Sequence, residues 1–483
     1  TPSVVHFGAD GVILVGKEAI AKSFSTSRRT VSEIKRFMGR NFDDERLKKR
    51  SWPFEVVRGS EGRVGIQADG DSWSPEEISA IILKEMKKLA SKYVEDVKDA
   101  VITVPSHFSN VQRKATAEAA EIAGLNVLRI INEPTAAAIA FNHNFPSNRK
   151  KNILVYDLGG GTFDVSIVEI HGMKSRVLAT DGSTFLGGRD FDLKIYEEAV
   201  ARFKEDEIDI LDGNIELLAR CEQAKRHLAK KDVVSITHRT HKGEEAEVEL
   251  TYDTFFEICE ELVDETIRLV DRALADSKIS KSSLDEIILV GGSTRLRPVR
   301  ERIARHFPSK EIRTNFDPDL AIVRGAAILA ASLAKENEGP RSTSNAPRVD
   351  LIDVTPLSLG IKADDRMSII IPKNTPLPAS SFKMYTSADK TDLMLTLEVV
   401  EGENQADFTR LAQFMFLVLP SFVRKSELVF QVSFAIDESG ILTVSAKDPE
   451  LNSPLTREVK SSNLSADERC KLTKQLNRLT INS

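Results

Sequence analysis

An apolar run followed by three glycines, a threonine and two acids stands at Ile153-Leu-Val-Tyr-Asp-Leu-Gly-Gly-Gly-Thr-Phe-Asp164. A buried strand would bring this turn to a ligand, and glycines without Cβ would let backbone N–H groups approach phosphate oxygens. Asp157 and Asp164 flank the turn. Carboxylates repel phosphate unless a cation lies between them, so we expect Mg²⁺, bound through water. For the glycine run alone, a hairpin turn with a capping aspartate is the alternative.

A second glycine turn has the same design. The segment 285–295 reads Asp-Glu-Ile-Ile-Leu-Val-Gly-Gly-Ser-Thr-Arg, and a helix-forming sequence follows from Arg297. Two such turns predict two walls of a nucleotide cleft. Between them, Glu222, Lys225 and Arg226 share one helix face at i, i+3, i+4 spacing and could grip a ribose and cover a base. Taken alone, these three residues would indicate a solvated charged helix.

The elements that position these turns follow an α/β order first and a β order later. Ser74 with Glu77 forms a capping box before an apolar helix face, and Ser109 with Gln112 begins another helix. Strands at 101–104 and 128–131 flank that second helix, which predicts a βαβ unit with parallel pairing. Further elements are expected as paired strands at 165–170 and 175–180 and as helices at 190–206, 214–230, 252–277 and 317–336.

Composition sets limits on the class of protein. The chain has 483 residues, 41% hydrophobic and 29% charged, which suits a globular protein with two or three cores. A net charge of −6 gives no electrostatic reason to expect nucleic acid or an anionic membrane as a partner. The three cysteines are far apart in sequence, which favours a reducing compartment. No apolar run approaches the roughly 20 residues of a membrane helix.

Four motifs together resemble the seventy-kilodalton heat-shock chaperones. The first motif is the glycine turn at 153–164, which we call the phosphate turn. The other three are 131–138 (Ile-Asn-Glu-Pro-Thr-Ala-Ala-Ala), 289–295 and 353–360 (Asp-Val-Thr-Pro-Leu-Ser-Leu-Gly). All four stand in the family's order and at compatible spacing. The resemblance covers essentially the whole chain. It implies an α/β actin-like two-lobed ATPase domain, then a β-sandwich peptide-binding domain and the start of a helical lid. The implied bounds are 1–336 for the ATPase domain, 337–353 for the linker, 354–460 for the sandwich and 461–483 for the lid.

The resemblance also implies roles for individual residues. Lys35 matches the lysine that holds the attacking water, Glu133 the acid that orients metal-bound water, and Thr162 the hydroxyl that reaches the γ-phosphate. Metal ligation, through water, falls to Asp157, Asp164 and Glu133, with ATP or ADP and Mg²⁺ as cofactors and K⁺ as a further candidate ion. Nucleotide contacts are assigned to Gly159, Gly160, Gly161, Glu222, Lys225, Arg226, Gly291, Gly292, Ser293, Arg295 and Asp319. In this scheme Arg226 and Arg295 sandwich the adenine.

Several positions depart from the family pattern. The chain opens after the family's first phosphate hairpin, so we expect slower ATP hydrolysis than in a chain that has it. Ala229 replaces a serine that touches the base, and Arg189 replaces a ribose-contacting glutamate, which predicts weaker adenosine binding. Asp350 lies inside the apolar linker, where a buried unpaired carboxylate would cost several kcal/mol. Docking of the linker is therefore expected to suffer.

The sandwich supplies the expected peptide site. By resemblance, one apolar side chain of an extended peptide enters a pocket formed by Ile361, Ala388, Leu395 and Leu397. Alternating leucines in a sandwich are, however, as readily core residues. Implied partners are unfolded or extended polypeptides, J-domain co-chaperones and nucleotide-exchange factors, with no nucleic acid and no membrane.

Three functions remain open from the sequence. An ATP-gated folding chaperone is favoured, followed by a peptide-binding or scaffold fragment with little ATPase activity. An actin-fold small-molecule kinase is disfavoured, because such an enzyme needs no β-rich domain after residue 353. Cys221 before Glu222 resembles the eukaryotic cytosolic branch of the family, so a cytoplasmic location is expected.

Overall fold

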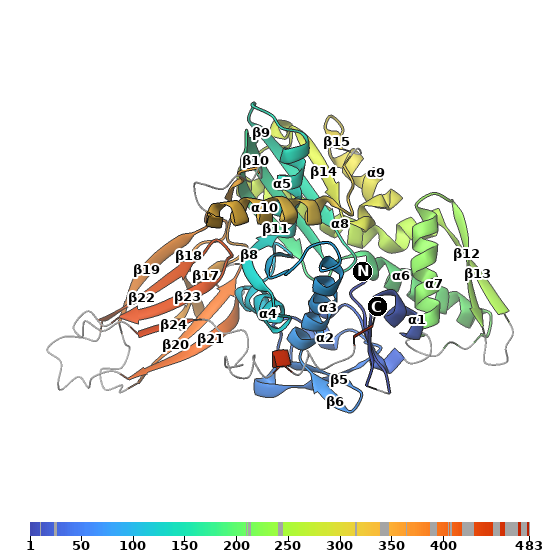
Figure 1. Ribbon diagram of the computed structural model, residues 1–483. Helices are drawn as coiled ribbons and strands as arrows, with labels where there is room; N and C mark the ends of the chain where they lie inside the picture. The colour runs from blue at the N-terminus through green and yellow to red at the C-terminus, as the bar shows by residue number, and fades with distance from the viewer. Residues whose placement is uncertain are drawn as a thin grey trace.

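The structure is a computed structural model of the chain. It describes residues 1–9, 11–23, 27–208, 210, 214–239, 245–313, 316–338, 347–363, 365–386, 394–403, 405, 408–417, 429–447, 455–458, 472–474 and 481–482. Three parts follow one another, which we call the first lobe (1–150), the second lobe (151–338) and the sandwich (358–458) (Figure 1). None of the described helices is long and apolar enough to cross a membrane.

The first lobe combines short sheets with helices that pack on them. Its elements are β1 (Val5–Phe7), β2 (Ile13–Val15), α1 (Lys17–Ser23), η1 (Ser27–Arg29), β3 (Thr30–Val31), η2 (Ile34–Arg36), α2 (Glu45–Lys48), β4 (Glu55–Arg58), η3 (Ser60–Gly62), β5 (Val64–Ala68), β6 (Asp71–Trp73), α3 (Pro75–Ala90), β7 (Asp99–Val104), α4 (Asn110–Ile122), β8 (Asn126–Asn132) and α5 (Glu133–Asn144). A buried apolar cluster that includes Phe37, Ile66 and Ile78 holds the sheets against α3.

Local sequence signals explain how two of these helices begin. The Ser74 hydroxyl accepts a hydrogen bond from the Glu77 backbone N–H, and Ser109 does the same for Gln112, so both predicted capping boxes are confirmed. Helix α4 is followed by Gly124 at φ +75°. Strands β7 and β8 on either side of α4 pair in parallel, which confirms the predicted βαβ unit.

The second lobe is organised around one six-stranded sheet of the described chain, with the order β15-β14-β9-β10-β11-β16. The last strand, β16 (Asp350–Ile352), belongs to the linker. Its elements are β9 (Lys151–Leu158), β10 (Phe163–His171), β11 (Lys174–Ser183), α6 (Gly188–Glu205), α7 (Ile215–Leu228), β12 (Val233–Arg239), β13 (Glu245–Thr251), α8 (Tyr252–Ser277), η4 (Lys281–Ser283), β14 (Glu286–Val290), η5 (Gly292–Arg295), α9 (Arg297–His306), β15 (Glu311–Arg313) and α10 (Ala321–Glu338). The predicted strand pair is confirmed as β10 and β11, and the long helix has the predicted bounds.

The linker pairs with the second lobe in spite of its acid. Strand β16 (Asp350–Ile352) adds in parallel to the edge strand β11, with Lys174 opposite Asp350. The Asp350 side chain is 56% exposed and its carboxylate lies 3.9 Å from the Lys174 Nζ. The expectation of a buried unpaired carboxylate is therefore wrong, because the edge position leaves this side chain in water.

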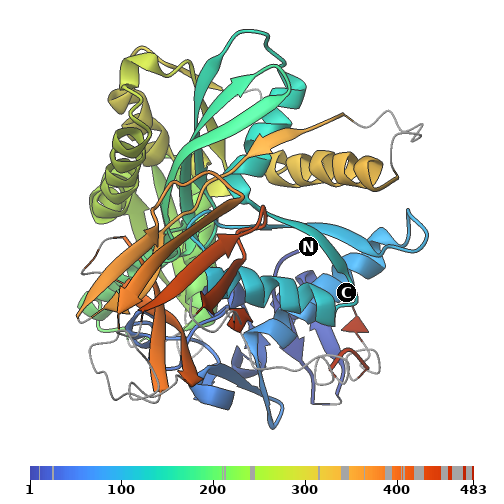
Figure 2. The same ribbon diagram turned by 90° about the vertical axis from the view of Figure 1, so that its left-hand side faces the viewer.

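The sandwich consists of two four-stranded sheets within the described residues, with the orders β18-β17-β20-β21 and β19-β22-β23-β24. Its strands are β17 (Ser358–Ala363), β18 (Arg366–Ile371), β19 (Ala379–Thr386), β20 (Met394–Gly402), β21 (Phe408–Leu417), β22 (Val429–Ile436), β23 (Leu442–Lys447) and β24 (Leu455–Glu458). Apolar residues such as Val399, Val432 and Phe434 are buried between the sheets. The two sheets extend together away from the lobes in Figure 1, and in Figure 2 they lie in front of the lobes.

The C-terminal segment, where a lid is predicted, is described only in part. Most of 461–483 lies outside the described residues, so the start of a helical lid stays a prediction. Strand β25 (Ile481–Asn482) instead pairs in parallel with β2 and extends the first-lobe sheet to the order β25-β2-β1-β3. The two ends of the chain accordingly lie near each other (Figure 1).

Candidate functional site

The two glycine turns of the sequence meet in the structure. Each follows one of two neighbouring parallel strands, β9 and β14, which pair with Val290 opposite Asp157. The Ser293 hydroxyl donates to the Gly159 carbonyl oxygen at 2.9 Å and links the two turns. Gly291 has φ +82°, and a Cβ there would lie 2.3 Å from the Leu158 carbonyl oxygen. Only glycine allows the second turn to approach the first this closely.

The first turn of helix α6 lies against the phosphate turn. The Gly188 N–H donates to the Gly159 carbonyl at 2.9 Å, and the Arg189 N–H donates to the Gly160 carbonyl at 2.8 Å. A Cβ on Gly187 would lie 2.6 Å from backbone atoms of Gly161. The loop before α6 therefore needs glycine to support the phosphate turn.

Four ionisable side chains from both lobes gather beside these turns. Asp157 and Asp164 face each other across strands β9 and β10, and Lys35 forms an ion pair with Glu133 at the start of α5. The Ser106 hydroxyl donates to Asp164 Oδ1 at 2.6 Å. Among the described residues, Asp157 Oδ2 and Asp164 Oδ2 are buried without any hydrogen-bond partner.

The electrostatics of this cluster favour the uncharged acids. Burial raises the pKa of Asp157 well above its ordinary value, and the nearby Glu133 and Asp164 raise it further. Burial also raises the pKa of Asp164 to about 7, with Glu133 adding to the shift and Ser106 opposing it. Buried acids that repel one another and lack partners are the groups that a bound cation stabilises. The cluster therefore fits a divalent cation held by oxygen ligands.

The charged side chains predicted to contact the nucleoside are paired with groups of the protein. Lys225 is buried, and its Nζ contacts Asp192 Oδ1 and the Gly188 carbonyl, each at 2.7 Å. Arg226 pairs with Glu222 one turn earlier on α7. Lys225 is therefore linked to the phosphate turn through Gly188, in the first turn of α6.

On the second glycine turn, Arg295 makes two hydrogen bonds to Asp319 at 3.0 and 2.8 Å. A Cβ on Gly292 would lie 3.5 Å from the Asp319 carboxylate, so this pair borders the second turn. The Arg226 and Arg295 side chains are 73% and 50% exposed. Their stacking on an adenine stays a prediction.

Two residues of the site, Ser106 and Arg36, were not predicted from the sequence. Ser106 follows the parallel strand β7, so its place at the end of a βαβ strand was the available signal. Arg36 is adjacent to Lys35 and donates through Nη2 to the Gly161 carbonyl at 2.9 Å. No pattern in the sequence indicated that Arg36 would reach the other lobe.

A buried hydrogen-bond network connects this site to the linker. The Asn132 side chain donates to Asp353 Oδ1 at 2.9 Å, and the Thr135 hydroxyl donates to Asp353 Oδ2 at 3.0 Å. Arg113 is buried and donates to Asn132 and to the Ser106 carbonyl. Asn132 precedes Glu133 in the chain, so one hydrogen bond and one peptide bond connect the end of the linker to the carboxylate cluster.

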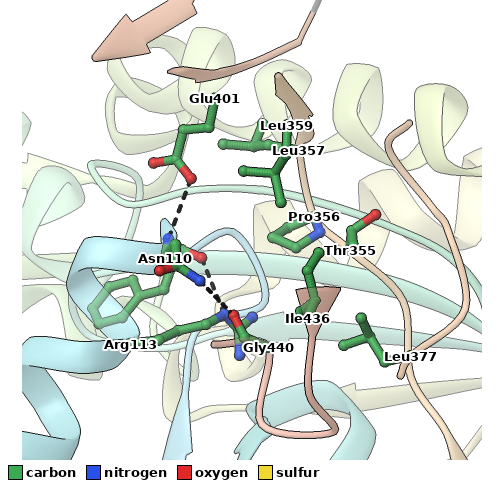
Figure 3. Close-up of a pocket in the computed structure, with 11 residues that line it drawn as sticks. Asn110, Arg113, Thr355, Pro356, Leu357, Leu359, Leu377, Glu401, Ile436 and Gly440 are labelled. Atoms are coloured by element: carbon green, nitrogen blue, oxygen red, sulfur yellow. Dashed lines mark hydrogen bonds between the residues drawn. The ribbon is translucent and has the colours of Figure 1, made fainter. Parts of the chain in front are cut away.

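A cavity lies between the first lobe and the sandwich, outside the nucleotide cleft (Figure 3). At its rim the Asn110 N–H donates to Glu401 Oε2 at 3.2 Å, and the Asn110 amide donates to the Gly440 carbonyl at 2.7 Å. Burial raises the pKa of Glu401 to about 7. The sandwich thus contacts the first lobe through a buried acid.

A second junction joins the sandwich to the second lobe. Asp181 is fully buried and accepts hydrogen bonds from Arg272 Nε and Nη2, both at 2.9 Å. Lys373 of the sandwich lies 3.5 Å from Asp181, 3.2 Å from Asp276 and 3.2 Å from Glu403. One ammonium group therefore bridges three carboxylates across the junction.

Two residues of the predicted peptide pocket, Ile361 and Leu397, have side chains that the structure describes. Ile361 and Leu397 are each 3% exposed and belong to the sandwich core. Ala388 and the side chain of Leu395 lie outside the described residues. Their burial agrees with the core interpretation of Ile361 and Leu397 in this conformation, and a peptide-binding role for them stays a prediction.

A two-lobed α/β nucleotide domain of the actin-like ATPase type, followed by a β-sandwich, defines the class of this protein. The chain belongs to the Hsp70 protein family, whose sequence model matches residues 1–481. It is therefore a member of a family of nucleotide-binding molecular chaperones.

Two curated relatives agree with this assignment. The chain is 39% identical over 460 residues to the "Heat shock 70 kDa protein" of Neurospora crassa, covering 92% of this chain and 70% of the relative. It is 38% identical over 462 residues to a protein of Eremothecium gossypii described as a ribosome-associated molecular chaperone, covering 92% of this chain and 74% of the relative.

Proposed function

We propose that this protein is an ATP-driven chaperone that hydrolyses Mg·ATP between its lobes and binds extended apolar segments of unfolded proteins in its sandwich. One observation supports the ATPase part most strongly. In the described structure, Asp157 and Asp164 each keep a buried oxygen without a hydrogen-bond partner, beside Glu133 and a glycine turn. Burying such groups is unfavourable unless a ligand satisfies them.

The residues of the cluster have separable tasks under this proposal. Bound Mg²⁺ would neutralise the phosphate and carboxylate charges. Asp157, Asp164 and Glu133 would hold that ion through water. The Lys35 ammonium, kept near the cluster by Glu133, would hold the attacking water and stabilise the negative charge that develops on the phosphate. The backbone N–H groups of 159–161 would bind phosphate oxygens, and the Thr162 hydroxyl would reach the terminal phosphate.

The test removes one charge at the cluster without changing its shape. Asp157→Asn should lower the rate of ATP hydrolysis by roughly 100-fold and abolish its dependence on Mg²⁺. Its melting temperature without nucleotide should hold or rise, because the substitution removes a buried carboxylate that Glu133 and Asp164 repel. Asp71→Asn, at an exposed acid of β6, is the matched control. Unchanged turnover in Asp157→Asn would refute the metal-site assignment.

Peptide binding needs a separate measurement. If Leu397 contacts a bound peptide, Leu397→Ala should weaken binding of a fluorescent peptide with a central leucine. Because Leu397 is a core residue here, the same substitution should also destabilise the sandwich by about 2–5 kcal/mol. Peptide titration of the folded fraction, with a thermal melt, separates the two effects. Undiminished binding by a folded Leu397→Ala protein would place the peptide site elsewhere.

The same proposal names the partners. Unfolded polypeptides would be the substrates, with J-domain co-chaperones and nucleotide-exchange factors acting on the ATPase cycle. The buried network from Glu133 through Asn132 to Asp353 supports communication between nucleotide and linker. Measuring hydrolysis with and without an unfolded substrate protein tests whether the two domains are coupled.

A further inference from the structure

The segment that carries Lys35 contacts the second lobe on both sides of this lysine. Before it, the Glu33 carboxylate pairs with Arg189 Nε at 3.0 Å. After it, Arg36 pairs with Asp190 at 2.7 Å. Both partners lie in the first turn of α6. Lys35 is therefore held between two ion pairs that cross the nucleotide cleft.

The two ion pairs, which we call crossings of the cleft, differ in burial. The side chains of Arg36 and Asp190 are 2% and 7% exposed, and Arg50 also contacts Asp190 at 2.6 Å, so this crossing is part of the packed interior. The side chains of Glu33 and Arg189 are 19% and 24% exposed. The Glu33–Arg189 pair is therefore the crossing that water can reach and that an opening of the cleft would separate more readily.

The backbone at Glu33 adds a second observation. Glu33 has φ 55° and ψ 25°, in the left-handed region that is unfavourable for a non-glycine residue. Its carboxylate lies 3.1 Å from Arg36 and 3.0 Å from Arg189, so two guanidinium groups hold this conformation. Glu33 is the N-cap of η2, and its backbone thus sets the direction in which Lys35 leaves the chain.

Arg189 is fixed in turn to the phosphate turn. Its backbone N–H donates to the Gly160 carbonyl at 2.8 Å. A continuous path therefore runs from the phosphate turn through Arg189 and Glu33 to Lys35. The Lys35 side chain itself is 42% exposed, and its long stem needs such support to keep one geometry.

We propose that Glu33 and Arg189 are a positioning pair that places Lys35 for hydrolysis only when the two lobes are closed. This inference rests on the ATPase function proposed above. Neither residue contacts the reacting atoms in this scheme. Closing the cleft brings Arg189 to Glu33, and the segment 33–36 then holds Lys35 beside Glu133.

A double-mutant cycle tests the pair. Arg189→Gln and Glu33→Gln should each lower kcat about tenfold while nucleotide affinity stays unchanged, because only the geometry at Lys35 is disturbed. The double variant should be no slower than either single variant, since the two residues act through one contact. Arg189→Lys should recover part of the rate. Lys194→Gln, at an exposed ion pair on the same helix, is the control and should match the parent.

Two outcomes of the cycle would overturn the proposal. Additive losses would show that the two residues act independently. A loss of affinity with kcat unchanged, in Arg189→Gln alone, would show that Arg189 contacts the nucleotide directly instead.

A second measurement does not depend on hydrolysis. Acetic anhydride labelling of the nucleotide-free protein, read by mass spectrometry, reports how freely the Lys35 amine reacts. Arg189→Gln should raise Lys35 labelling relative to Lys48, and Lys194→Gln should leave the ratio unchanged. Unchanged Lys35 labelling in Arg189→Gln would overturn the proposal that Glu33 and Arg189 position Lys35. A parent protein that binds no nucleotide, with the labelling change present, would refute the ATPase proposal and leave the contact between Glu33 and Arg189 standing.

Discussion

The nucleotide cleft and the junction between the second lobe and the sandwich both bury carboxylates. The two regions differ in whether the buried carboxylate oxygens have hydrogen-bond partners. At the junction, the Asp181 carboxylate accepts from Arg272 twice and from the Gly182 N–H, and Lys373 lies close by. In the cleft, Asp157 and Asp164 each retain a buried oxygen that no described group satisfies. Removing a satisfied buried acid leaves its partners without their counter-charge, whereas an unsatisfied buried oxygen requires an explanation such as a bound ligand.

The pKa shifts agree with this contrast. Burial by itself would lower the pKa of Lys373, but Asp181, Glu403 and Asp276 outweigh it and raise that pKa, so the ammonium stays charged. In the cleft, the pKa of Asp164 is raised to about 7 because burial dominates and Glu133 adds repulsion. The junction carries its own cation in Lys373, and we propose that the cleft takes up a divalent cation from solution.

The largest effect is expected from filling the contact between the two glycine turns. Gly291→Ala should destabilise the second lobe by about 3 kcal/mol or more, because its Cβ would meet the Leu158 carbonyl at 2.3 Å with φ at +82°. Urea denaturation measures the change. Gly70→Ala, at φ +85° with no atom within 4 Å, should cost only about 1 kcal/mol. Equal losses would show that backbone conformation alone, and not the close approach of the turns, requires Gly291.

Removing the satisfied acid should come next in size. Asp181→Asn should destabilise the protein by about 1.5–3 kcal/mol, because Arg272 loses its hydrogen-bonded counter-charge and Lys373 keeps, among the described residues, only Asp276 and Glu403. Asp157→Asn at the unsatisfied site should keep or gain stability. Denaturation of both variants in the same buffer sharpens the comparison. A larger loss of stability in Asp157→Asn than in Asp181→Asn would contradict the contrast between the two sites.

A smaller effect is expected at the nucleoside end of the cleft. Arg295→Ala and Arg226→Ala should each weaken ADP binding by roughly 1–2 kcal/mol if the two guanidinium groups stack on the adenine. Calorimetry of each variant measures this directly. Arg305→Ala, on the outer surface of α9, serves as the control. Unchanged ADP affinity in both variants would make Arg226 and Arg295 ordinary surface residues, paired with Glu222 and Asp319.

The smallest expected effect is a pH dependence of docking at the cavity rim. Burial raises the pKa of Glu401 from an ordinary 4.5 to about 7, while Asn110, Ser109 and Arg113 oppose the shift. The docked state therefore takes up a proton, and docking of the sandwich should be strongest below about pH 4.5 and weaken as the pH rises through 7. Energy transfer between dyes on the first lobe and the sandwich would follow this change. Glu401→Gln should remove the pH dependence, and a slope identical to that of the parent would exclude Glu401 as its source.

Local patterns account for the parts of the site that the sequence predicted. The capping boxes at Ser74 and Ser109, the βαβ unit and both glycine turns depend on residues a few positions apart, so neighbouring side chains and backbone dihedral angles decide them. Parallel pairing of β9 with β14 then brings the two turns together, as two strands of one sheet must. The expected cost of Asp350 was wrong because edge exposure is not a property of a sequence pattern.

The sequence by itself therefore determined that this chain has a glycine turn flanked by acids, a second glycine turn and a change from α/β to β order. Only the tertiary structure decided which acids are satisfied and which segments cross the cleft. Asp181 with Lys373, and Glu33 with Arg189, come from distant parts of the chain. In a local sequence pattern these four charged residues look like ordinary surface residues. Their burial and their ion-pair partners are decided only when separate elements pack against one another.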